Sequence, residues 1–317
     1  TDALSRSVRV VAEKDFRDAI KSRALLILGA VFVVFFASAA YFFADQVSQV
    51  IQNAANSSNA TQAQQAQQVR DSLTSDAFLG TLTQITRLLI PLTGIVVSYA
   101  ALVGERESGT MKLLLALPHS RFSVVLGKLL GRSGVVVVPV LLGFLVAAPV
   151  FPILGVTLKP VGFLAFALAT ALIGVVFVAI SLGASAAAST ARRAVVGVVG
   201  LYVLFTLLWG QFSNAIFQQI SDNTDLGNEA LIKVFLVVRH LNPVRAYESL
   251  VASVGQPELQ ARTSVFSGLQ GQFFAQALEQ GGGLPFYLTD PALVVYLLLW
   301  IAVPVALGYW AFQRADL

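Results

Sequence analysis

Long apolar stretches alternate with short polar connectors along this chain. Six stretches reach the roughly 18–20 residues that a helix needs to cross the apolar core of a bilayer. Two polar insertions, residues 45–77 and 219–290, interrupt the pattern. The pattern predicts an all-α integral membrane protein with two helical insertions on one side and with spans at Ala24–Ala44, Leu79–Val103, Ser133–Phe151, Val161–Ala188, Ala194–Gln218 and Pro291–Phe312.

Residues 1–23 carry an amphipathic pattern instead. The apolar positions that share one helical face are Leu4, Val8, Val11, Ala12, Phe16, Ala19 and Ile20, and charged residues fill the rest. This spacing predicts a helix that lies in the membrane interface ahead of a six-span domain, residues 24–317. The alternative is a solvated N-terminal helix.

The first span could be mistaken for a signal peptide, because Ala37-Ser38-Ala39 imitates a cleavage site behind an apolar core. The charged region of a signal peptide is short, however, whereas here it extends over residues 1–23. We therefore expect a retained membrane span.

Both insertions contain helix signals. The first is rich in Gln, Asn, Ala and Ser, with a helix predicted at Gln62–Leu73. The second predicts helices at Leu226–Leu241, after Asn242-Pro243, and at Glu258–Glu279, followed by a glycine hinge at 281–283. We expect its aromatic residues to face a small core or lipid headgroups; they are Phe235, Phe266, Phe273 and Phe274.

Composition agrees with a membrane protein and excludes several other classes. Only 12% of the residues are charged, against about a quarter in soluble domains. The absence of cysteine excludes disulfides and thiolate sites, and two histidines with no H-E-x-x-H give no metal site. The net charge of +4 does not indicate nucleic-acid binding, because the basic residues are distributed by membrane side.

Charge also predicts the orientation. Of the 21 Lys and Arg residues, 14 lie in the N-terminal segment, the 104–132 loop, the turn at 192–193 and the tail, with 7 of the 17 Asp and Glu residues. Cytoplasmic loops carry the excess of Lys and Arg. We expect a multi-pass plasma-membrane protein with both termini and the 104–132 loop in the cytoplasm and both insertions outside.

The 104–132 loop is a charged connector between two long apolar spans. Its helix signals are Gly104 as a stop, Thr110 as a cap, Pro118 as a break and Ser120 as a second cap of a helix that runs into Gly127 and Lys128. These signals predict two short helices at the membrane surface.

The loop sequence E-R-E-S-G-T-x-x-x-L-L-x-x-P-x-S-R-x-x-x-x-x-G-K resembles the first cytoplasmic loop of ABC-2-type export permeases, in the branch that includes Nos-type permeases. The resemblance implies that this loop docks onto a separate ATP-binding subunit, that an elbow helix precedes the spans, and that the second basic turn also faces the ATPase. The residues concerned are Glu105, Arg106, Glu107, Gly109, Thr110, Met111, Leu114, Leu115, Pro118, Ser120 and Arg121 in the loop, and Arg192 and Arg193 in the turn.

We expect Glu105 and Glu107 to pair with basic residues of the ATPase, and Met111, Leu114 and Leu115 to give apolar contacts. The alternative for the two glutamates is stabilisation of a helix N-terminus, worth about 0.3–1 kcal/mol each. The alternative for Arg192 and Arg193 is a positive-inside anchor.

Several kinds of chemistry are missing from the sequence. There is no G-x-x-x-x-G-K-[ST], since Gly127-Lys128 is followed by Leu129, and neither G-x-S-x-G nor a pair of carboxylates lies within the spans. We therefore expect no catalytic, cofactor or metal site in this chain, with ATP and Mg bound by the partner.

The expected assembly has two permease subunits, identical or different, two ATP-binding subunits and the lipid bilayer. The alternative function is a non-transporting scaffold that uses the same ATPase coupling to act on an extracytoplasmic protein.

Two further features are ambiguous in the sequence. Arg87 in the second span is either a pathway residue or a side chain that snorkels to the outer interface. The segment Asn242-Pro243-x-x-x-Tyr247 is similar to one that precedes the last span of Nos-type permeases, and we attach no chemistry to it.

Overall fold

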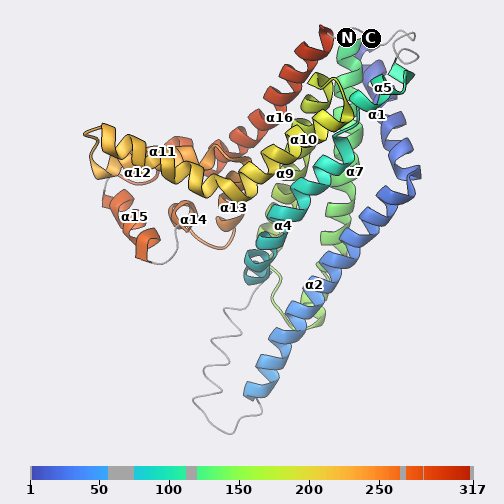
Figure 1. The fold of residues 1–317 in the computed structure, drawn as a ribbon. Coiled ribbons are helices and arrows are strands. Elements are labelled where there is room, and N and C mark those ends of the chain that lie inside the picture. Colours follow the sequence, from blue (N-terminus) through green and yellow to red (C-terminus); the bar gives the residue numbers. More distant parts are fainter. Residues whose placement is uncertain (1, 56–74, 112–119, 265–268, 281, 315–317) are drawn as a thin grey trace.

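A computed structural model describes residues 2–55, 75–111, 120–264, 269–280 and 282–314. All helices of eight or more residues in these parts are α1 (Asp2–Lys21), α2 (Arg23–Ala55), α4 (Ser75–Ser98), α7 (Arg121–Ala147), α9 (Pro160–Ala187), α10 (Ala191–Val203), α11 (Trp209–Asn223), α12 (Asn228–His240), α13 (Pro243–Ala252), α15 (Leu269–Gln280) and α16 (Asp290–Gln313). Short helices are α5 (Val103–Glu107), α8 (Val150–Ile153), α14 (Glu258–Thr263) and a 3₁₀ turn at Phe286–Leu288. The chain is helical, as predicted (Figure 1).

Six helical stretches in the described parts are long and apolar enough to cross a membrane. They are Leu26–Gln49, Phe78–Glu107, Arg121–Ile153, Pro160–Ala187, Ala191–Asn223 and Asp290–Gln313. The predicted number and order of spans are therefore confirmed. Both chain termini lie at one end of the bundle, beside α5 (Figure 1). We call this the terminal end, and the opposite end, where α4 and α9 begin, the insertion end.

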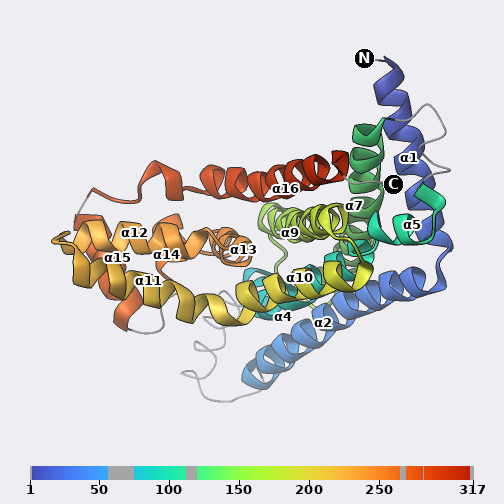
Figure 2. The same cartoon turned by 45° about the horizontal axis from the view of Figure 1, so that its top comes forward.

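Helix α9 lies at the centre of the bundle, in contact with α4, α7, α10, α13 and α16 (Figure 2). It is apolar all round and contains small residues that let its neighbours approach. A Cβ added to Gly308 of α16 would lie 2.6 Å from the Cα of Gly183 in α9. Glycine at this crossing therefore sets the distance between the fourth and sixth spans.

The helix end predicted at Gly104, at the terminal end of the second span, is wrong. Helix α4 ends at Ser98 rather than at Gly104, and Gly104 lies inside the separate short helix α5. Tertiary contacts cause the break, because Ser185 accepts hydrogen bonds from the backbone N–H groups of Leu102 and Val103, both 3.1 Å long.

The predicted short helix after Ser120 is not separate from the third span. Ser120 does cap a helix, as predicted, since its hydroxyl accepts from the backbone N–H of Ser123 at 3.1 Å. That helix is α7, which continues through Lys128 and Arg132 to Ala147. Hydropathy placed the start of the third span at Ser133, because charged residues such as Lys128 and Arg132 lower the mean hydropathy. In the fold, both side chains form ion pairs with carboxylates.

The fifth span is interrupted by a π-helical turn, Leu204–Leu208, that was not predicted. Helix α10 precedes the turn and α11 follows it, leaving the spans to pack against α12. Single π turns inside α-helices occur frequently at functional sites.

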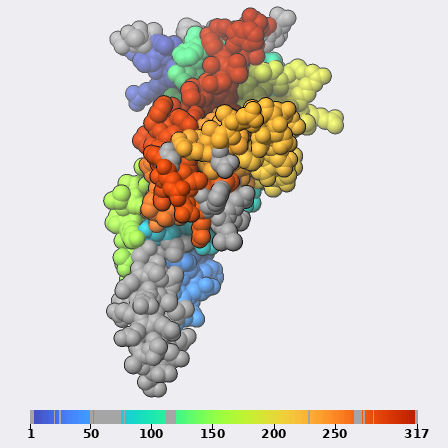
Figure 3. Space-filling model, turned by 90° about the vertical axis from the view of Figure 1, so that its left-hand side faces the viewer, coloured from blue at the N-terminus to red at the C-terminus, as the bar shows by residue number. Residues whose placement is uncertain are grey.

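The second insertion forms a helical lobe beside the spans, seen as one continuous gold and orange mass in Figure 3. Helices α12 and α13 match the prediction, but the single helix predicted at Glu258–Glu279 is wrong, because α14 ends at Thr263 and α15 begins at Leu269. Phe235 and Phe274 do lie in a small core of the lobe. Phe266 falls outside the described residues.

In the first insertion, α2 extends through residues 45–55 beyond the predicted span. The helix predicted at Gln62–Leu73 falls outside the described residues.

Candidate functional site

Two glycines of α7 bring the N-terminal helix α1 against the terminal end of the bundle. A Cβ on Gly127 would lie 2.6 Å from the Cβ of Val11, and one on Gly131 would lie 2.9 Å from the carbonyl oxygen of Ala12. Small residues four apart on one helix face allow such close packing. Gly127 and Gly131 therefore form a helix-packing motif, a signal that we missed in the sequence.

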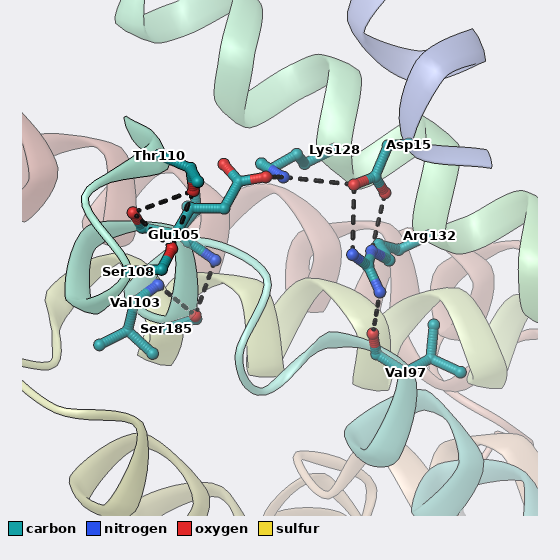
Figure 4. A network of polar contacts seen from close by, with 10 residues as sticks. Asp15, Val97, Val103, Glu105, Ser108, Thr110, Lys128, Arg132 and Ser185 are labelled. Carbon is teal, nitrogen blue, oxygen red and sulfur yellow. Dashed lines mark hydrogen bonds and ion pairs between the residues drawn. The ribbon is translucent and has the colours of Figure 1, made fainter. Parts of the chain in front are cut away.

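The close packing of α1 and α7 places Asp15 beside Lys128. The Lys128 Nζ lies 3.2 Å from Asp15 Oδ1 and 2.7 Å from Glu105 Oε1 (Figure 4). The Lys128 ammonium group thus joins α1, α7 and α5, the short helix that contains Glu105.

Arg132, one helical turn further along α7, binds the same aspartate. Its Nε lies 2.7 Å from Asp15 Oδ2, and its Nη1 donates to the carbonyl oxygen of Val97 in the last turn of α4 at 2.9 Å (Figure 4). The four charged groups Asp15, Glu105, Lys128 and Arg132 are hereafter the charge network. It contains two cations and two carboxylates and connects four separate helices.

The charge network is largely removed from solvent. The side chains of Lys128 and Asp15 are 3% and 7% exposed. Removing one partner of such a buried pair leaves an uncompensated charge and costs about 3–5 kcal/mol. Lys128 and Asp15 therefore depend on each other inside the bundle, and Glu105 of the loop, 30% exposed, binds to this buried pair through Lys128.

The other charged residues of the loop hold the neighbouring helix ends. Glu107 Oε1 accepts from the backbone N–H of Ala191 at the start of α10, at 3.0 Å. The Arg106 guanidinium donates to the carbonyl oxygens of Ala186 and Ala188, at 3.0 and 3.1 Å, where α9 ends.

Arg121 extends this arrangement to the last span. Its Nη1 donates to the carbonyl oxygens of Phe312 and Gln313, at 2.7 and 2.8 Å, at the end of α16. Arg106 and Arg121 also lie over the Phe312 ring, 5.6 and 5.5 Å from its centroid. A displacement of the loop would therefore act on α9, α10 and α16 as well as on α1 and α7.

At the insertion end, Asn242 and Tyr247 connect the second insertion to three spans. The Asn242 side-chain amide donates to the Phe205 carbonyl in the π turn at 2.7 Å, and its oxygen caps α13. The Tyr247 hydroxyl lies 2.8 Å from that of Thr86 in α4 and 3.0 Å from that of Thr170 in α9. Complete burial raises the pKa of Tyr247 to about 12.

His240, just before this segment, is fully buried at the end of α12 and hydrogen bonds through Nδ1 to the Leu236 carbonyl at 2.7 Å. Burial is the main cause that lowers its pKa to about 4, and the nearby cations Arg262, Arg239 and Arg245 act in the same direction. His240 is therefore neutral near pH 7. Within the described residues, no three His, Asp or Glu side chains are grouped so that they could hold a metal ion.

The sequence model described as "ABC-2 family transporter protein" matches residues 9–317. This chain belongs to the ABC-2 family.

Relatives include a "Probable ABC transporter permease protein NosY" from Stutzerimonas stutzeri, 28% identical over 312 residues, which cover 96% of this chain and 97% of the relative. A protein of the same name from Pseudomonas aeruginosa strain PAO1 is 27% identical over 97% of this chain and 98% of its own length. The ABC-2 chain is thus a multi-pass membrane permease subunit of an ABC system, which implies an ATP-binding partner.

The structure places the predicted docking residues of the ABC-2 loop in two groups. Glu105 binds Lys128, and Met111, expected to contact the ATPase, is only 1% exposed and packs with buried residues of α4, α7 and α9. Exposed residues are Glu107, Ser108, Gly109, Thr110, Ser120, Arg192 and Arg193. Leu114, Leu115 and Pro118 fall outside the described residues.

Gly109 and Thr110 shape the exposed turn. Gly109 has a φ of 75°, in the left-handed region that glycine adopts without strain. Thr110 is itself helical, so it is not the predicted cap; its hydroxyl donates back to the Glu105 carbonyl oxygen at 3.3 Å.

Arg87, the predicted pathway or snorkelling residue, lies at the insertion end. Its Nη1 is 2.7 Å from Glu248 Oε1, and Arg245 of α13 binds the other carboxylate oxygen at 2.6 Å. The three side chains line a cavity of about 640 Å³.

Proposed function

We propose that this chain is the membrane half of an ABC exporter, and that the 104–132 loop couples ATP hydrolysis on a separate subunit to movement of the spans. The observation that carries the proposal is the double contact of Lys128, with Glu105 in the loop and Asp15 in α1. A displacement of Glu105 would act directly on the buried Lys128 ammonium, which Asp15 of α1 also binds.

Two parts of the loop region would take part in the coupling. The exposed turn from Glu107 to Thr110, together with Arg192 and Arg193, would contact the ATPase. Glu105 would transmit displacement of that turn to α1 and α7 through the charge network, while Arg106 and Glu107 would transmit it to the ends of α9 and α10.

The functional assembly would contain two permease chains and two ATP-binding subunits, which hold ATP and Mg. The bias of Lys and Arg toward the terminal end supports a cytoplasmic location for the termini and the loop, in the plasma membrane. The cysteine-free sequence makes this testable with single cysteines. A membrane-impermeant maleimide added to intact cells should label Glu279→Cys and not Arg193→Cys, and the reverse result would invert the topology.

A second candidate function is mechanical action on an extracytoplasmic protein without transport. It is supported by the contacts of Asn242 and Tyr247, which join the second insertion to the second, fourth and fifth spans through α4, α9 and the π turn. Transport of a substrate by reconstituted complexes would favour the exporter, and ATP-driven change in the lobe without transport would favour the mechanical function.

The experiment that tests ATPase coupling is purification of the tagged chain from its native membranes in mild detergent. The wild-type chain should retain a protein with a P-loop and with ATPase activity, and Glu105→Arg/Glu107→Arg should lose it. Glu279→Arg, an exposed substitution in α15, is the matched control. Absence of any P-loop ATPase with the wild-type chain under all nucleotide conditions would contradict the proposal.

A further inference from the structure

Two hollows lie side by side at the insertion end of the bundle. The first is the polar cavity of about 640 Å³ beside Arg87, and the second is a groove of about 680 Å³ between α9, α13 and α16. They share Asp76, Lys159 and Val254 in their linings. The polar cavity and the apolar groove therefore adjoin each other at these three residues, as a polar half and an apolar half of one candidate site.

The polar half has an excess of one positive charge. Its charged lining consists of three cations, Arg87, Lys159 and Arg245, and two carboxylates, Asp76 and Glu248. Both arginines bind the single Glu248 carboxylate, and each uses only Nη1 for a side-chain bond among the described residues. The Nε atoms of both arginines are buried, so their Nη2 groups are the ones that can bind an anion in the cavity.

Lys159 is held at the junction of the two halves. Its backbone N–H donates to the Ser75 hydroxyl at 3.0 Å, and its Nζ lies 2.7 Å from Asp76 Oδ2. The Lys159 side chain is still 54% exposed, so its ammonium group can reach a second anion. It thus stands where a headgroup would meet the start of an acyl chain.

The apolar half runs along α9 away from Lys159. Val161, Leu164 and Leu168 are 83%, 58% and 53% exposed in the isolated chain, on a helix that is long and apolar enough to span the bilayer. The distance from Val161 to Leu172 is about 16 Å at 1.5 Å per residue, which matches much of an acyl chain. The apolar lining is Val161, Ala165, Leu168, Ala169, Leu172, Leu250 and Val294.

We propose that this combined hollow binds an anionic phospholipid, with its phosphate between Lys159 and the two arginines and one acyl chain in the groove along α9. The groove also contains the Asp290 carboxylate, which is paired with Arg262 outside the lining. The excess positive charge of the polar half therefore remains and selects an anionic over a zwitterionic headgroup, and the adjoining groove selects a lipid over a free anion. The site touches α4, α9, α13 and α16, so the bound lipid connects the second insertion to the spans.

The test is native mass spectrometry of the full chain in detergent, titrated with phosphatidylglycerol or phosphatidylcholine. Phosphatidylglycerol should bind more tightly, and Lys159→Gln/Arg245→Gln should weaken its binding roughly tenfold or more. Lys233→Gln, which removes a half-exposed ion pair on α12, is the control and should leave binding unchanged. Equal affinity for both lipids, or an equal loss with the control, would overturn the proposal.

A second variant tests the apolar half separately. Ala165→Trp fills the groove and should weaken binding of both lipids, whereas Ala302→Trp, on an exposed face of α16 outside the groove, should not. Competition with inorganic phosphate distinguishes the two sources of the anion. If phosphate displaces phosphatidylglycerol completely and Ala165→Trp has no effect, the hollow is a free-anion site and the lipid proposal is wrong.

Discussion

The Asn242 side-chain amide donates a hydrogen bond to the carbonyl oxygen of Phe205, with 2.7 Å between nitrogen and oxygen. Phe205 lies in the π turn of the fifth span, and Asn242 is the cap that begins α13 in the second insertion. Where a π turn replaces the regular α-helical pattern, a side chain can satisfy a backbone carbonyl that the helix leaves available. One buried side chain thus joins a bend in a span to the lobe outside it.

Two substitutions at Asn242 separate its two roles. Asn242→Ala removes both the cap and the bond to Phe205, whereas Asn242→Ser keeps an oxygen that can cap α13. We expect Ala to reduce the free energy of unfolding by about 2–4 kcal/mol and Ser to reduce it by about 1 kcal/mol less. Thermal unfolding of the purified chain in detergent measures the difference. Identical melting of the two variants would show that the cap contributes nothing.

The packing of α1 on α7 depends on Gly127. Gly127→Leu should displace α1, because the new Cβ would lie 2.6 Å from the Cβ of Val11 and such overpacking costs about 1–3 kcal/mol. Limited trypsin digestion should then cleave faster at Lys14 and Arg17. Gly197→Leu is the matched control, since a Cβ there meets no atom within 4 Å. Equal cleavage rates for the two variants would contradict the docking role of Gly127.

Lys128 is expected to be the most sensitive member of the charge network. Lys128→Met leaves the Asp15 and Glu105 carboxylates short of a partner and should cost about 3–5 kcal/mol of unfolding free energy. Adding Glu105→Gln should restore part of that loss. Denaturant or thermal unfolding of these two variants and of Glu105→Gln alone measures the coupling, and a purely additive result would show that Lys128 and Glu105 do not interact.

His240 should make stability depend on pH below neutrality. Its pKa is about 4 in the folded chain against about 6.5 when unfolded, so only the unfolded chain binds a proton between these values. Stability should therefore be full above pH 6.5 and fall as the pH is lowered toward 4, by about 3 kcal/mol in total from this residue. Melting curves of the wild type minus those of His240→Gln isolate the effect, and a difference that does not change between pH 7 and 4.5 would disprove it.

Hydropathy was sufficient for the helices that face lipid or apolar neighbours throughout their length. The predicted spans Val161–Ala188 and Pro291–Phe312 differ by one residue at each end from α9 and α16. In these two helices the ends coincide with the change from apolar to polar residues, so a window of mean hydropathy is enough to locate them.

Hydropathy failed where charged residues are buried by distant partners. The start of the third span was placed at Ser133, because Lys128 and Arg132 read as surface charges. In the fold, Asp15 binds both of them and Glu105 supplies a second negative charge to Lys128. Asp15 lies more than one hundred residues away in sequence, and no local pattern reports such a contact. The π turn was missed for the same reason, since its bond to Asn242 is tertiary.

The candidate site was found from the motif, but its internal geometry was not. The loop sequence identified Glu105 and Glu107 as functional candidates and assigned both to the ATPase. The structure gives Glu105 a partner in Lys128 and Glu107 a partner in the Ala191 N–H. A glutamate that binds its own chain and one that binds another subunit have the same local sequence, so only the fold distinguishes them.

We propose that ATP-driven displacement of the 104–132 loop is transmitted through the charge network as far as the insertion end. The direct measurement is the rate at which a maleimide labels Gln256→Cys, in the polar cavity, in the purified complex with its ATPase, with and without ATP. ATP should change the labelling rate, and Glu105→Gln should reduce that change while Glu13→Gln, exposed on α1, should not. An unchanged ATP response with Glu105→Gln, or no response in a complex that hydrolyses ATP, would contradict the account.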